Sequence, residues 1–162
     1  MNTPAEVNCK IQSREIESHE QKDFLKRHFR TAIVQANMET LFIHLVRTQQ
    51  LLSDSNGGAL KFYEVTSQYG SVPVICHDTD CEKLTVRNFM FDTRAEFPSL
   101  LAALTATTLT LETLLRTLQD KGIEFSDALT DYYNNLWYNL TRTGSTLAAE
   151  IDLAKEYFDF TD

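Results

Sequence analysis

The sequence predicts a mainly α-helical protein, an antiparallel bundle of four to five helices with a small β-hairpin insertion around residues 71–91. Three observations support this fold class. Glycine and proline are scarce, with 5 and 3 among 162 residues, whereas a sandwich of many short strands needs frequent turn residues. Apolar residues recur at helical spacing over most of the chain. The segments with this spacing are joined by short connections, as in an antiparallel bundle.

The length of the chain corresponds to one domain, which we place over residues 1–162. A chain of this size buries roughly 70% of the surface that its unfolded form exposes, so it needs neither a metal nor a disulfide to fold. A capping-box pattern of Thr3, Pro4 and Glu6 predicts a short helix at the start. We expect residues 1–17 to pack loosely, because residues 12–23 are mostly polar.

The longest segment without glycine or proline predicts the central helix of the bundle. A second capping-box pattern, Ser18 with Gln21, precedes it, and the helical spacing continues to about Leu52. Apolar side chains occupy two faces of this helix, which is typical of a helix buried between others. The sequence SDSNGG at residues 53–58 ends it.

The middle of the chain is the one region with β character. For residues 59–70, start and stop signals at Asn56 and Gly70 favour a short helix, although KFYEVT within the segment has strand propensity. We predict the helix and keep the strand as the alternative. The segments VPVIC and KLTVRNFMF, separated by a polar cluster, predict the hairpin of residues 71–91.

Helices are again predicted in the second half of the chain. One begins near Pro98 and is stopped by Gly122, the next is capped by Ser126 and runs towards Gly144, and the last covers residues 145–158. The last helix carries one apolar stripe, which we expect to face the core: Leu147, Ile151, Ala154 and Phe158.

The charge of the chain excludes some function classes. The net charge is −8, and residues 92–162 hold 5 basic against 12 acidic side chains. Binding to nucleic-acid phosphates needs a basic face, so we expect no nucleic-acid partner. There is no leader pattern and no run of about 20 apolar residues, so we predict a cytoplasmic protein without a membrane partner. The chain has an odd number of cysteines, 3, and in the cytoplasm we expect them to be reduced thiols.

The sequence VICHDTDCEK at residues 74–83 is the one candidate for metal or thiol chemistry. Zinc sites combine four N or S ligands, and no second cysteine pair exists. Adjacent strand residues such as Cys76 and His77 point to opposite faces, whereas Cys76 and Cys81 could be cross-strand neighbours close enough for a disulfide. We interpret the segment as a hairpin turn and expect no metal and no cofactor. A metal- or thiol-dependent sensor using Cys76, His77 and Cys81 remains the alternative.

The sequence contains no pattern that indicates catalysis. It has no glycine-rich phosphate loop, no nucleophile elbow, no Ser/His/Asp pattern and no Glu-x-x-His pair. We therefore favour a non-enzymatic protein. The alternative is a helical enzyme whose acidic residues come together only in the folded chain.

Two helical faces are unusual for a surface in contact with water. Residues 97–111 carry no charge, so that helix is either the buried centre of the bundle or has an interface on its back. Residues 131–140 place a tryptophan and a tyrosine beside polar groups, a composition enriched in binding hot spots. The alternative is that another element, such as the hairpin or the N-terminal helix, covers these rings. The candidate partner-binding residues are Ala102, Ala106, Leu109, Thr113, Trp137 and Tyr138.

These observations predict a protein–protein interaction module. We expect a cytoplasmic adaptor, regulator or inhibitor that acts through an acidic, aromatic-bearing helical face. We also expect the chain to form a homodimer.

Overall fold

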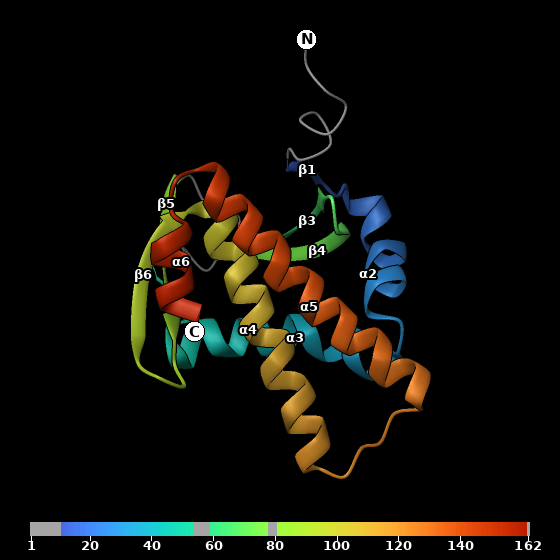
Figure 1. The fold of residues 1–162 in the computed structure, drawn as a ribbon. Helices are drawn as coiled ribbons and strands as arrows, with labels where there is room; N and C mark the ends of the chain where they lie inside the picture. Colours follow the sequence, from blue (N-terminus) through green and yellow to red (C-terminus); the bar gives the residue numbers. More distant parts are fainter. Residues whose placement is uncertain (1–10, 54–58, 78–80, 162) are drawn as a thin grey trace.

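The computed structural model describes residues 11–53, 59–77 and 81–161, and it places two three-stranded antiparallel sheets around a pair of long helices (Figure 1). Helix α4 contacts both sheets and the helices α3 and α5. In chain order the elements are β1 (Gln12–Glu15), the short 3-10 helix η1 (Ser18–Glu20), α2 (Gln21–Phe29), α3 (Ala32–Gln49), β2 (Leu52–Ser53), β3 (Leu60–Ser67), β4 (Gly70–His77), β5 (Lys83–Asn88), β6 (Thr93–Pro98), α4 (Ser99–Asp120), α5 (Asp127–Glu150) and α6 (Ala154–Thr161).

The predicted helical bundle with one small hairpin is wrong, because the described strands form two sheets with the orders β1-β3-β4 and β2-β5-β6. The two halves of the predicted 71–91 hairpin do not pair with each other. Strand β4 pairs with β3 through the two-residue turn Gln68–Tyr69, and β5 pairs with β6. Residues 60–67 form a strand and no helix, so the strand propensity of KFYEVT prevailed over the flanking helix signals.

The predicted helix from Ser18 to Leu52 is interrupted at Arg30, whose φ of 58° lies in the left-handed region. Two tyrosines of α5 satisfy backbone carbonyls at the end of α2. Tyr132 donates its hydroxyl to the carbonyl of His28 at 2.6 Å, and Tyr133 donates to that of Phe29 at 2.6 Å. The last carbonyls of a helix lack partners within it, so these bonds stabilise the break.

The central helix of the molecule is α4, not the segment at residues 18–52. Its uncharged N-terminal half is buried, and its interior threonines donate their hydroxyls to carbonyls four residues earlier in the helix. The hydroxyl of Thr107 also accepts a hydrogen bond from the backbone amide of Ile75 at 2.9 Å, which links α4 to β4. Threonine therefore serves here as a buried, satisfied core residue.

Helix α5 continues through Gly144 and ends at Glu150, so the predicted helix of residues 145–158 is wrong. The chain turns at Asp152, which has a φ of 62°, and α6 starts at Ala154. This turn changes which side chains face the core: Tyr157 and Phe160 are buried, whereas Phe158 is 62% exposed. Figure 1 shows the resulting position of α6, beside β6.

Several helix ends agree with their sequence signals. Helix α4 begins directly after Pro98, and Gly122 follows its end with a φ of 78°. The hydroxyl of Ser126 accepts a hydrogen bond from the amide of Leu129 at 3.2 Å, as expected for an N-cap. The predicted helix near Thr3 and the centre of the cysteine loop, residues 78–80, lie outside the described residues. None of the helices within the described ranges has the length and apolarity needed to cross a membrane.

Candidate binding surface

A pocket of about 340 Å³ lies between α4, α5, α6 and the turn that joins β5 to β6. We call it the apolar pocket, because rings, methyl groups and methylenes form most of its wall. Its volume is near the lower end of the range of small-ligand sites, about 300 to 1,000 Å³. The lining residues are Asn88, Met90, Phe91, Thr105, Thr108, Leu109, Glu112, Trp137, Thr141, Ser145, Tyr157, Phe158, Phe160 and Thr161.

Two phenylalanine rings are exposed where they line the apolar pocket. Phe91 is 69% exposed and Phe158 is 62% exposed, more than any other large hydrophobic side chain of the described residues. Monomeric proteins tolerate single exposed apolar residues, whereas here two exposed rings line the same apolar pocket, and we call the pair the exposed patch. By composition, the exposed patch and its pocket form the candidate contact surface.

The β5–β6 turn holds Phe91 in this exposed position. The side-chain oxygen of Asn88 accepts a hydrogen bond from the amide of Met90 at 3.2 Å, and the backbone carbonyl of Asn88 accepts one from the amide of Phe91 at 3.3 Å. Asp92 follows with a φ of 52°, and its carboxylate pairs with Arg87 at 3.0 Å. Asn88 is buried, so its two hydrogen bonds anchor the turn to the interior of the protein. The ring of Phe91 faces solvent.

The wall of the apolar pocket contains few ionisable groups. Burial raises the pKa of Tyr157 to about 12, so its phenol is neutral at physiological pH. The carboxylate of Glu112 pairs with Arg116 at 3.3 Å. The indole Nε1 of Trp137 is buried and donates to no acceptor within the described residues. The pocket therefore offers mainly apolar contact, with a few groups that can hydrogen-bond.

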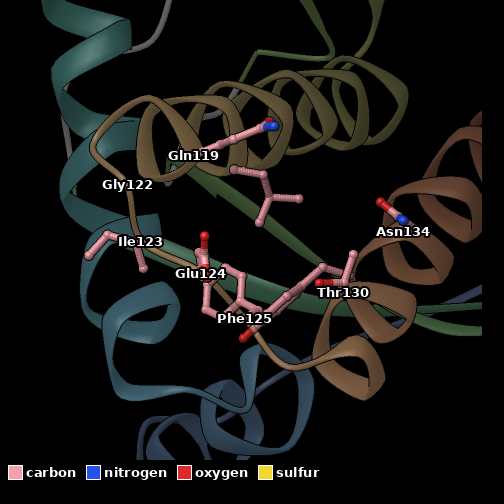
Figure 2. A pocket seen from close by; sticks show the side chains of 9 residues that line it. Gln119, Gly122, Ile123, Glu124, Phe125, Thr130 and Asn134 are labelled. Carbon is pink, nitrogen blue, oxygen red and sulfur yellow. The ribbon is translucent and has the colours of Figure 1, made fainter.

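A second pocket, of about 420 Å³, lies where α4 ends and α5 begins, and we call it the loop pocket. Figure 2 shows Gln119 and Asn134 on its two helices and the connecting residues Ile123 to Phe125 along one side. Phe125 packs on Tyr133 with ring centroids 5.1 Å apart. Gln119, Glu124 and Asn134 are exposed, so water can solvate the polar part of this pocket.

The structure describes three of the side chains of the cysteine segment that were considered as ligands. Cys76 is half-buried, His77 is buried and Cys81 is exposed. Cys76 and Cys81 are not joined by a disulfide. Within residues 11–53, 59–77 and 81–161, the one group of side chains close enough to share a cation is Glu17, His19 and Glu20 of the exposed η1 region, which includes none of the three predicted ligands.

A buried histidine joins α2 to β3. The Nε2 of His28 lies 3.1 Å from the carboxylate of Glu64, which also pairs with Arg27 at 2.6 Å. Burial lowers the pKa of His28, and the hydrogen bond to Glu64 only partly opposes this effect. The three side chains satisfy one another, so this network links two elements of the fold.

The predicted partner-binding residues are distributed over the core and two surfaces. Ala102 and Ala106 are fully buried within the chain. Of the two alternatives for this helix, a buried position or an interface on its back, the buried position applies to these two residues. Leu109 and Trp137 line the apolar pocket. Thr113 is half-buried and donates its hydroxyl to the carbonyl of Leu109 at 2.8 Å. Tyr138 is 49% exposed and lies outside the pocket.

The two exposed rings of the apolar pocket were not singled out from the sequence. One continuous helix over residues 145–158 would place Phe158 on the core stripe, and the predicted hairpin would place Phe91 in its second strand. No glycine or proline marks the break at Asp152, so no simple signal predicted that Phe158 would turn outward. Neither a scan against protein-family models nor a search of curated proteins finds a match to this chain.

Proposed function

We propose that this protein is a non-enzymatic interaction module that binds a segment of a partner protein at the apolar pocket. The observation that carries the proposal is the exposure of Phe91 and Phe158 beside a single apolar pocket. Covering an exposed aromatic side chain stabilises a complex by roughly 1.5–3 kcal/mol before the costs of association. Two such rings beside one pocket therefore provide the centre of a binding surface.

A protein segment fits this surface better than a small molecule. A ligand confined to the pocket would leave most of both rings in water, whereas a segment of chain can insert one large side chain and cover the rim. Residues 92–162, which supply most of the pocket, hold 5 basic against 12 acidic side chains. This acidic character disfavours nucleic acid as the occupant.

The chemistry of the pocket wall supports binding without catalysis. Of its 14 lining residues only Glu112 and Tyr157 carry side chains that ionise as acids or bases. Glu112 is held by Arg116, and Tyr157 keeps its proton to high pH because burial raises its pKa. General acid–base catalysis works best when the group's pKa lies near the working pH.

Selection of peptides tests the proposal. The full chain is used to select binders from a displayed library of random peptides, in parallel with the double variant Phe91→Ser/Phe158→Ser and the control Ile123→Ser. The control removes an exposed apolar side chain from the loop pocket. We expect peptides with an aromatic or large aliphatic anchor that bind the native chain and the control but not the double variant. A native chain that enriches no such peptide, or peptides that bind the double variant equally well, would refute the proposal.

The homodimer expected from the sequence remains a prediction. Light scattering at several concentrations should give a mass that approaches twice 18.6 kDa. If Phe91→Ser/Phe158→Ser abolishes this association, the occupant of the apolar pocket is a second copy of the chain. If the native chain stays at 18.6 kDa at every concentration, the homodimer is excluded.

A further inference from the structure

A cluster of two tyrosines and an arginine lies beside the apolar pocket, and we call it the Tyr–Arg cluster. The guanidinium carbon of Arg142 is 4.1 Å from the ring centroid of Tyr138 and 5.1 Å from that of Tyr69. Arg142 and Tyr138 belong to α5, whereas Tyr69 lies in the turn between β3 and β4. The side chains of all three residues are exposed to solvent.

The Tyr–Arg cluster is continuous with the apolar pocket around α5. The ring of Tyr138 makes an edge contact with the indole of Trp137, with centroids 6.3 Å apart, and Trp137 lines the pocket. A segment bound in the pocket can therefore extend over the Trp137–Tyr138 pair and reach Arg142. Tyrosine, tryptophan and arginine are the residues most enriched in binding hot spots.

Arg142 retains the capacity to bind an anion. It is the one basic residue of α5, and within the described residues its guanidinium makes no hydrogen bond and no ion pair. The two rings lie against the guanidinium and restrict its motion, while its N–H donors point along the plane of the group. A carboxylate accepts two parallel hydrogen bonds from such a fork, and the cost of ordering the side chain is reduced in advance.

We propose that the Tyr–Arg cluster recognises a carboxylate of the same partner segment that fills the apolar pocket. This inference rests on the proposed function. Charge complementarity supports it, because Arg142 is the one basic residue of α5 on a protein of net charge −8. The net charge alone would repel an acidic peptide, so a preference for an acid must come from a local site.

The peptides selected against the native chain provide the test. We expect Asp or Glu to recur at a fixed spacing from the apolar anchor. A selected peptide and its acid-to-amide version, Asp to Asn or Glu to Gln, are then titrated against the native chain, Arg142→Gln and the control Lys155→Gln. Lys155 is an exposed cation on α6, so its replacement makes the same change in net charge near the pocket.

We expect the amide version to bind about tenfold more weakly than the acid on the native chain and on Lys155→Gln, and equally well within twofold on Arg142→Gln. Selected peptides with an anchor but no recurring acid would overturn this inference and leave the proposed function intact. If the amide version also binds tenfold more weakly than the acid on Arg142→Gln, this inference is overturned and the proposed function stays intact. A selection without anchors would overturn both.

Discussion

The apolar pocket and the loop pocket are both built on α4 and α5, yet they differ in what they expose to water. The loop pocket is larger, at about 420 Å³ against 340 Å³, but its polar residues are exposed and its aromatic rings pack on each other. The apolar pocket is smaller and has two exposed phenylalanines beside it. Affinity comes from the apolar surface that a partner removes from water, so our proposal places binding at the smaller pocket.

The difference between the two pockets has a local cause in each case. At the loop pocket the chain after Gly122 turns Phe125 inward onto the ring of Tyr133. The hydroxyl of Tyr133 donates its hydrogen bond to the carbonyl of Phe29 at the end of α2. At the apolar pocket the turns at Asp92 and Asp152, both with positive φ, direct Phe91 and Phe158 outward. Two backbone turns therefore create the exposed patch.

The largest effect is expected from Phe91→Ser/Phe158→Ser. Loss of both rings should weaken the binding of a selected peptide about 100-fold, which corresponds to about 2.8 kcal/mol. Stability should change by less than about 0.5 kcal/mol, because both rings are exposed in the free protein. Fluorescence of Trp137, the single tryptophan of the chain and a lining residue, can report the titration. Equal affinities of the variant and the native chain would remove the distinction between the pockets.

The next largest effect is expected at the contact between Gly144 of α5 and Tyr157 of α6. A Cβ at Gly144 would overlap the hydroxyl and ring of Tyr157 and lie 3.1 Å from a methyl group of Leu104. Gly144→Ala should therefore lower the free energy of unfolding by about 2 kcal/mol, although alanine favours a helix. Urea denaturation measures the loss. Addition of Tyr157→Phe, which removes the hydroxyl, should restore part of it, and an unchanged midpoint for Gly144→Ala would show that α6 packs differently.

Alkaline pH should destabilise the wall of the apolar pocket. The pKa of Tyr157 is raised in the folded state, to about 12, above its ordinary value of 10.0. The folded state therefore holds the proton more tightly, so this contribution is complete below pH 10 and is lost as the pH rises towards 12. At pH 11 the loss amounts to roughly 1.4 kcal/mol. The difference in unfolding free energy between the native chain and Tyr157→Phe should change by this amount between pH 9 and 11, whereas a constant difference would place the phenol in water.

The smallest effect is expected at the loop pocket. Ile123 is 39% exposed, and Ile123→Ser should change the free energy of unfolding by less than about 0.5 kcal/mol. The affinity for a selected peptide should stay within twofold of the native value in the same fluorescence titration. A tenfold loss of affinity in Ile123→Ser would show that the loop pocket takes part in binding.

Some of the helix ends could be predicted from the sequence because their causes are local. Pro98 fixes its own φ, Gly122 adopts a φ of 78° that other residues disfavour, and Ser126 supplies a hydroxyl to a free amide. Each of these effects acts within a few residues. The breaks at Arg30 and Asp152 have no such marker, and at Arg30 the hydrogen bonds at the end of α2 come from distant tyrosines of α5.

The sheets could not be predicted because strand pairing depends on distant partners. The β character of residues 71–77 and 83–88 is visible in the sequence, but it does not show that β4 pairs with β3 or that β5 pairs with β6. The alternative hairpin would need a longer loop than the two residues that join β3 and β4. The short turn at Gln68–Tyr69, followed by Gly70 with a φ of 102°, favours the observed pairing.

Two of the predicted partner-binding residues lie at the candidate site, and their role in binding stays a prediction. Leu109 and Trp137 were identified because the uncharged and ring-bearing faces of two helices stand out in the sequence, and both line the apolar pocket. Phe158 was missed because a continuous helix would have placed it on the core stripe. The turn at Asp152 rotates the helix that follows, so that Tyr157 takes the buried position and Phe158 faces solvent.

Hydrogen exchange of the full chain, with and without a selected peptide, tests most directly which of the two pockets binds. We expect slower exchange at residues 88–91 and 154–161, which flank the apolar pocket, and unchanged exchange at residues 121–130. Slower exchange confined to residues 121–130 would contradict this expectation and assign the binding to the loop pocket.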